Sequence, residues 1–132
     1  MPGIEIEVKP GIHVLVIFNN STRTEVIEKF LFHAGYGSDS FGVEEPPRLS
    51  SWDFINLCQE SEKYDCIIID AHTDSNKGIW KETRGSFRAN CLRTPQLCAV
   101  GYKSEEQKNR IQEVLGTALE YKRSLPLTER RY

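Results

Sequence analysis

The chain has 132 residues, of which 39% are hydrophobic and 27% charged, and its formal net charge is −2. This is the composition of one globular domain with a single core, and the small negative charge gives no reason to expect nucleic acid or an anionic membrane as a partner. No apolar run approaches the ~18 residues of a membrane-spanning helix, and the acidic N-terminal residues do not fit a signal peptide. We therefore expect a cytoplasmic domain that binds neither nucleic acid nor membrane.

The first third of the chain predicts two strands, a helix and a weaker strand. Apolar and charged side chains alternate over residues 4–8, which is typical of a half-buried strand. A turn at Pro10-Gly11 leads into the strongly apolar segment Ile12–Phe18, a second strand. Apolar residues at helical spacing over 26–34 predict an amphipathic helix. The segment Ser38–Val43 predicts a weak strand.

The middle of the chain contains its most apolar stretch. Four apolar residues in a row, Cys66–Ile69, lie between Asp65 and Asp70. An unbroken β-branched run of this kind suits a strand that is buried on both faces of a parallel sheet. Before it, Ser50 and Asp53 have the spacing of a capping box, which predicts the start of a short helix.

The last third alternates helical and strand patterns. Apolar residues recur at helical spacing over 79–87, and residues 90–95 form a connection. Gln96–Gly101 predicts a third apolar strand, and residues 104–119 give the clearest amphipathic helix. Tyr121–Leu125 predicts a last short strand.

This alternation predicts an α/β domain with three layers and a mainly parallel sheet. The flavodoxin-like strand order 2-1-3-4-5 is the leading candidate, and it places the carboxyl ends of the strands at Phe18 and Asp70 side by side. We assign residues 12–132 to this domain and residues 1–11 to an N-terminal extension or extra strand.

The pattern resembles the receiver domain of two-component signalling over residues 12–126. Asp70, at the end of the third strand, falls on the receiver's phospho-acceptor position. The segment LGTALEYKRSLP, Leu115–Pro126, is similar to the region where helix four leads into strand five and a proline. The resemblance implies a flavodoxin-like fold. Since only Leu127–Tyr132 follow Pro126, we expect the fifth helix of a receiver to be missing or truncated.

The other positions of the receiver machinery are degenerate. Receivers carry two acidic residues after strand one, a Thr or Ser after strand four and a Lys before the strand-five proline. Here Phe18-Asn19, Gly101 and Leu125 stand in those places. A lone carboxylate is a poor Mg²⁺ site, and without metal and Lys the charge of a transferring phosphoryl group is not stabilised. We therefore expect a non-catalytic pseudo-receiver, with an active receiver phosphorylated on Asp70 as the alternative.

A narrower resemblance rests on four strings: IHVLVIF, HAGY, CIIID and SFRAN. They are similar to the degenerate receiver near the N-terminus of the cAMP-specific phosphodiesterases of family eight, where a PAS domain and a metal-dependent catalytic domain follow. This resemblance implies a regulatory piece of a larger signalling enzyme, with no catalytic residues and no cofactor of its own. Its expected partners are another protein or other domains of the same chain, and a homodimer is a further form of association.

The segment Asp70–Asp74, DAHTD, gives a rival interpretation. It is similar to the DAHxD motif of the arginase and agmatinase family, which implies Asp70, His72 and Asp74 as ligands of paired Mn²⁺ ions. Alternate residues of an extended segment point the same way, so three ligands can converge there. The chain lacks that family's GGDH segment and later DxD pair. A small arginase-like metal-binding hydrolase therefore stays the second alternative.

The remaining residues with metal-binding or catalytic chemistry predict no site. The four cysteines show no CxxC pair and no zinc spacing, so we expect free thiols. His13 and His33 have no neighbouring partner in the sequence that would make them catalytic, and we expect both to be incidental.

Overall fold

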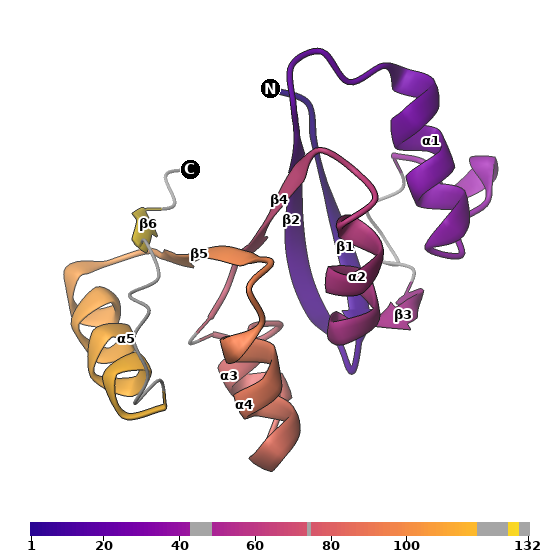
Figure 1. Ribbon diagram of the computed structural model, residues 1–132. Coiled ribbons are helices and arrows are strands. Elements are labelled where there is room, and N and C mark those ends of the chain that lie inside the picture. The colour runs from indigo at the N-terminus through magenta and orange to yellow at the C-terminus, as the bar shows by residue number, and fades with distance from the viewer. Residues whose placement is uncertain (43–48, 74, 119–126, 130–132) are drawn as a thin grey trace.

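The computed structural model describes residues 1–42, 49–73, 75–118 and 127–129 (Figure 1). These residues form an α/β domain in which helices flank a mixed sheet. The strands are β1 Gly3–Lys9, β2 Ile12–Phe18, β3 Leu49–Asp53, β4 Cys66–Asp70, β5 Leu97–Tyr102 and β6 Leu127–Glu129. The helices are α1 Thr24–His33, the 3₁₀ turn η1 Ser38–Ser40, α2 Phe54–Ser61, α3 Ile79–Glu82, α4 Gly85–Arg93 and α5 Glu105–Ala118.

The direction of β2 separates this sheet from the one that the sequence predicts. The strand order is β3-β1-β2-β4-β5-β6, so β2, β4, β5 and β6 are neighbours as in the flavodoxin-like order. However, β2 is antiparallel to both β1 and β4, whereas the other neighbouring pairs are parallel. The carboxyl ends of β2 and β4 therefore point in opposite directions along the strands. The expectation that Phe18 and Asp70 would be side by side is wrong.

A hairpin turn sets this direction. β1 and β2 are joined only by Pro10 and Gly11, and a two-residue connection forces neighbouring strands to run antiparallel. Gly11 has a φ of +127°, which a residue with a side chain rarely adopts. Its N–H donates to the carbonyl of Val8 at 2.8 Å. β1 is an interior strand of the sheet, between β3 and β2.

β4 is buried on one face only, which corrects the expectation of burial on both. Residues that pair directly across a sheet share a face, and successive residues alternate. One face of the β2–β4 pair carries Val16 and Ile68, which are buried, whereas Ile67 on the other face is 42% exposed. One hydrophobic cluster joins the first face to the helices and includes Val14, Val16, Ile68, Phe30, Leu57, Leu92 and Ile111. The described helices therefore add their buried side chains to one side of the sheet.

An aromatic cluster centred on Phe30 attaches α1 to this core. The Phe30 ring is fully buried and makes edge-to-face contacts with Phe18, Trp52 and Tyr64, with ring centroids 5.4, 5.4 and 5.1 Å away. Aromatic pairs favour this geometry because the positive edge of one ring meets the negative face of the other. The cluster brings together α1, β2, β3 and the residue before β4.

Several local elements differ from their sequence patterns. Residues 38–40 form a 3₁₀ turn rather than a strand. Ser50, the predicted start of a capping box, lies in β3 instead. Its hydroxyl donates to the carbonyl of Ala34 at 2.6 Å. Asp53 caps α2 and forms a reciprocal capping box with Asn56.

Differences continue toward the C-terminus. The helix expected over 79–87 is two helices, and α4 extends through most of the expected connection over 90–95. The predicted strand Tyr121–Leu125 lies outside the described residues, and β6 follows it. The expected absence or truncation of a fifth helix concerns Leu127–Tyr132, of which Leu127–Glu129 form β6 and residues 130–132 lie outside the described residues.

Candidate functional site

Asp70, the expected phospho-acceptor position, is enclosed by protein. Its side chain is 0% exposed, and Oδ2 accepts the N–H of Ile79 at 3.2 Å. Oδ1 has no hydrogen-bond partner among the described residues. Burial raises the pKa of Asp70 to about 6, although contacts with Thr73, Ile79 and His72 act in the opposite direction. Burial therefore disfavours the charged form of this carboxyl group relative to an exposed aspartate, and the group is not presented to solvent.

The structure separates Asp70 from most of the other receiver positions. Phe18 pairs with Cys66, at the far end of β4 from Asp70. Asn19 lies beyond it, where its Nδ2 donates to Asp65 Oδ2 at 2.8 Å. Gly101 is the exception, since it follows Val100, which pairs with Asp70. Leu125 lies outside the described residues.

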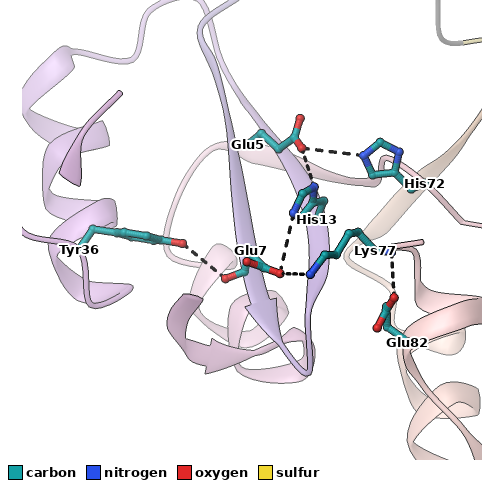
Figure 2. Close-up of polar contacts among 7 residues, drawn as sticks. All are labelled: Glu5, Glu7, His13, Tyr36, His72, Lys77 and Glu82. Atoms are coloured by element: carbon teal, nitrogen blue, oxygen red, sulfur yellow. Dashed lines mark hydrogen bonds and ion pairs between the residues drawn. The ribbon is translucent and has the colours of Figure 1, made fainter. Parts of the chain in front are cut away.

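A different set of polar side chains meets near the carboxyl end of β4 (Figure 2). Glu5 of β1, His13 of β2 and His72 of the following turn have one ligand atom each within 4.8 Å of one another. Glu5 Oε1 is 3.0 Å from His13 Nδ1 and 3.9 Å from His72 Nε2. The two imidazole rings have centroids 5.6 Å apart and are tilted by 56°. Two imidazoles and a carboxylate from three segments therefore converge on one point.

Glu7 and Lys77 lie next to this cluster, on the side of His13 that faces away from Glu5. Glu7 Oε1 lies 3.9 Å from His13 Nε2, the ring nitrogen that faces away from Glu5. The same oxygen accepts a hydrogen bond from Lys77 Nζ at 2.7 Å. Lys77 is further held by its backbone N–H, which donates to Glu82 Oε1 at 3.0 Å. Glu7 is largely buried. Lys77 forms an ion pair with its carboxylate, which also lies close to the second ring nitrogen of His13.

Backbone contacts fix the position of His72 relative to the hairpin. The N–H of His13 donates to the carbonyl of Lys77 at 2.8 Å, which ties the segment before α3 to the start of β2. The carbonyl of His72 accepts the N–H of Ser75 at 2.7 Å. A Cβ placed on Gly78 would come within 1.8 Å of that same carbonyl, so only glycine fits there. These contacts hold His72 beside β1 and β2 through the backbone.

The structure leaves the arginase-like ligand set untested, because one of its three members lies outside the described residues. The ligand atom of His72 groups with Glu5 and His13, and the buried Asp70 carboxylate is not part of that group. Asp74 lies outside the described residues.

Sequence reasoning found His72 but missed Glu5 and His13. The available signal was the hairpin: Val8 pairs with Ile12 across residues 9–11, which puts Glu7 opposite His13, and alternation then places Glu5 on the same face. His13 is thus not incidental in position.

Comparison with known proteins shows no relative of this chain. No protein-family model, curated protein or solved structure matches the chain. Within the described residues, none of the helices combines the length and the apolar character needed to cross a bilayer.

Proposed function

We propose that this chain is a non-catalytic pseudo-receiver that works through protein contacts within a larger cytoplasmic signalling protein. The observation that carries the proposal is the enclosure of Asp70: a phospho-acceptor must meet a phosphoryl donor, and this carboxyl group is fully buried and bonded to the N–H of Ile79. The resemblance of four segments to the family-eight cAMP phosphodiesterases supports a phosphodiesterase as the parent protein.

The fold fits a receiver-derived domain with one reversed strand. The adjacency of β2, β4, β5 and β6 is that of strands one, three, four and five in a flavodoxin-like sheet. The reversal of β2 moves Phe18 and Asn19 away from Asp70. An acidic pair introduced at those two positions would therefore not meet the Asp70 carboxylate, so the loss of the receiver site is architectural as well as chemical.

The sheet face opposite the core, to which the described helices contribute no core side chains, supports a role in protein contacts. Leu15, Ile17, Ile67 and Ile69 share the face opposite the core, and none of them belongs to the core cluster. Ile67 is the most exposed of them, at 42%. A contiguous apolar patch on a sheet face is typical of an interaction surface. In this proposal its partner is another domain of the same longer chain, as the resemblance implies.

Phosphorylation chemistry gives the first test. The purified chain is incubated with acetyl phosphate and Mg²⁺, and intact mass spectrometry measures the gain of a phosphoryl group. We expect no gain in the wild-type chain, as in its Asp70→Asn variant. A gain in mass that Asp70→Asn abolishes would restore the active receiver.

The parent protein gives the second test. The native transcript is sequenced beyond the codon for Tyr132, and we expect the reading frame to continue into a PAS-like segment and a phosphodiesterase domain. Within that longer protein, Ile67→Lys should change hydrogen exchange in a second domain, whereas Phe32→Lys, on an exposed α1 position, should not. A frame that stops near Tyr132 would contradict the phosphodiesterase assignment, and association of the isolated chain with itself through Ile67 would point to a homodimer instead.

A further inference from the structure

We propose that Glu5, His13 and His72 form a binding site for a divalent transition metal ion, with Zn²⁺ as the best-fitting ion. This inference does not rest on the proposed function, because it uses residues that the receiver resemblance does not employ. It also differs from the arginase-like ligand set, which would need Asp70. The site would connect three segments: β1, β2 and the turn after β4 (Figure 2).

The donor set matches the preferences of zinc. Two imidazole nitrogens and one carboxylate oxygen are a common protein ligand set for Zn²⁺, with a fourth position open to water. Tetrahedral ligands at about 2.0–2.2 Å from the ion lie about 3.3–3.5 Å from one another. The observed separations of Glu5 Oε1 from His13 Nδ1 and His72 Nε2, 3.0 and 3.9 Å, lie on either side of that value. All three ligand atoms lie within 4.8 Å of one another, so side-chain rotation would have to bring them to the tetrahedral separation.

The surroundings of His13 are those of a metal ligand with a supporting partner. Metal-binding histidines usually direct their second ring nitrogen to a carboxylate or carbonyl, which fixes the tautomer and the ring orientation. If His13 binds through Nδ1, its Nε2 faces Glu7 Oε1 at 3.9 Å. Lys77 holds Glu7 in place at 2.7 Å and balances its charge. Glu7 is thus the positioning residue, and it need not touch the ion.

Exposure of the cluster leaves a path for the ion. The Glu5 side chain is 41% exposed, whereas the side chains of His13 and His72 are only 23% and 17% exposed. One ligand therefore reaches solvent while the other two are held in place by the protein. Imidazole binds a metal only through an unprotonated nitrogen, so binding at His13 requires Nδ1 to carry no proton.

The test uses Co²⁺ as a spectroscopic substitute for Zn²⁺. Co²⁺ is titrated into the purified chain, and we expect saturation at one equivalent with the intense visible absorption of tetrahedral cobalt. Added Zn²⁺ should displace it and raise the thermal unfolding midpoint. Because the chain also has four cysteines, the near-ultraviolet charge-transfer band of cobalt thiolate is recorded and should be absent. Failure of Co²⁺ to saturate, or a thiolate band, would overturn the proposal.

Matched variants identify the ligands. Since the loss of an outer partner alone typically costs about 10–100-fold in affinity, His72→Gln should weaken Co²⁺ binding by more than about 100-fold. Glu5→Gln, at an exposed position, should keep the circular dichroism spectrum of the folded chain and weaken binding similarly. His33→Gln is the control, because it removes the remaining histidine, which lies on α1 beside Tyr64. Affinity unchanged in His72→Gln, or lost in His33→Gln, would contradict the site.

Glu7 provides an independent check of the supporting role. Glu7→Gln should lower the affinity about tenfold while the tetrahedral cobalt spectrum is retained. A changed spectrum would mean that Glu7 itself is a ligand, and unchanged affinity would mean that it does not position His13; either result overturns its assignment.

Discussion

Asp70 pairs with Val14 in an antiparallel register, so the carboxyl end of β4 lies beside the amino end of β2. This single pairing explains both features of the molecule that bear on function. It removes Phe18 and Asn19 from the neighbourhood of Asp70, and it brings the β1–β2 hairpin, with Glu5 and His13, next to the turn that carries His72.

The buried carboxyl of Asp70 should make stability depend on pH. Its pKa is raised to about 6 from 3.8, so the folded chain retains a proton that the unfolded chain has already released. Stability therefore falls as pH rises from about 4 to 7, by a total of about 3 kcal/mol for this group. Asp70→Asn removes the titration and should raise the free energy of unfolding at pH 7 by up to about 3 kcal/mol.

Urea unfolding at a series of pH values measures this effect, with EDTA present so that bound metal does not contribute. Asp39→Asn, at an exposed aspartate, is the matched variant for the loss of a carboxyl group. A profile for Asp70→Asn that falls as steeply as the wild-type profile would show that burial does not raise the pKa of Asp70.

Adjacent isoleucines of β4 should respond very differently to truncation. Ile68 lies in the core, and Ile68→Ala should cost about 2–5 kcal/mol of unfolding free energy because it leaves a cavity. Ile67 is 42% exposed on the opposite face, so Ile67→Ala should cost less than about 1 kcal/mol. Chemical denaturation of the two variants compares them directly. Equal costs would mean that both faces of β4 are covered, as in a three-layer domain.

Phe30 should dominate the attachment of α1. Phe30→Ala removes a fully buried ring that contacts three other aromatic rings, and it should cost about 3–5 kcal/mol. Phe32→Ala, two residues along the same helix at a side chain that is 51% exposed, is the matched control. Denaturation monitored by near-ultraviolet circular dichroism distinguishes the two, and a comparable loss in Phe32→Ala would contradict the assigned helix face.

The capping box at the start of α2 should contribute measurably. Asp53 accepts the N–H of Asn56 at 2.7 Å, and Asn56 Oδ1 accepts the N–H of Asp53 at 3.3 Å. Asp53→Ala should cost about 1 kcal/mol, whereas Asp53→Ser, which also caps helices, should retain most of that stability. Identical unfolding midpoints for the Ala and Ser variants would show that the cap contributes nothing.

The sequence predicts the strands of this sheet better than their directions. The apolar segments at Ile12–Phe18 and Cys66–Asp70 are strands as expected, because β-branched runs favour extended backbone. Hydrophobic pattern carries no information on direction, which here comes from the two-residue turn before Ile12. It also does not reveal that Ile67, on the face of β4 opposite the core, is 42% exposed.

The candidate site, too, is only partly predictable from the sequence. His72 is conspicuous in the sequence because it follows a buried strand, but its partners depend on strand pairing. Glu5 reaches it only because β1 is an interior strand and β2 is reversed. Similarly, Ser50 has the spacing of a capping residue, yet its hydroxyl bonds to Ala34 in a different element. Contacts of this kind lie beyond the reach of local patterns.

The most direct test of the central claim is the response of Asp70 to beryllofluoride, which mimics a phosphoryl group on a receiver aspartate. Amide spectra of the isotope-labelled chain are recorded at constant Mg²⁺ while beryllofluoride alone is varied, so that metal binding at His72 does not contribute. We predict no saturable shift at Asp70, Ala71 or Gly101. Saturable shifts at these amides that disappear in Asp70→Asn would contradict the pseudo-receiver and establish a working phospho-acceptor.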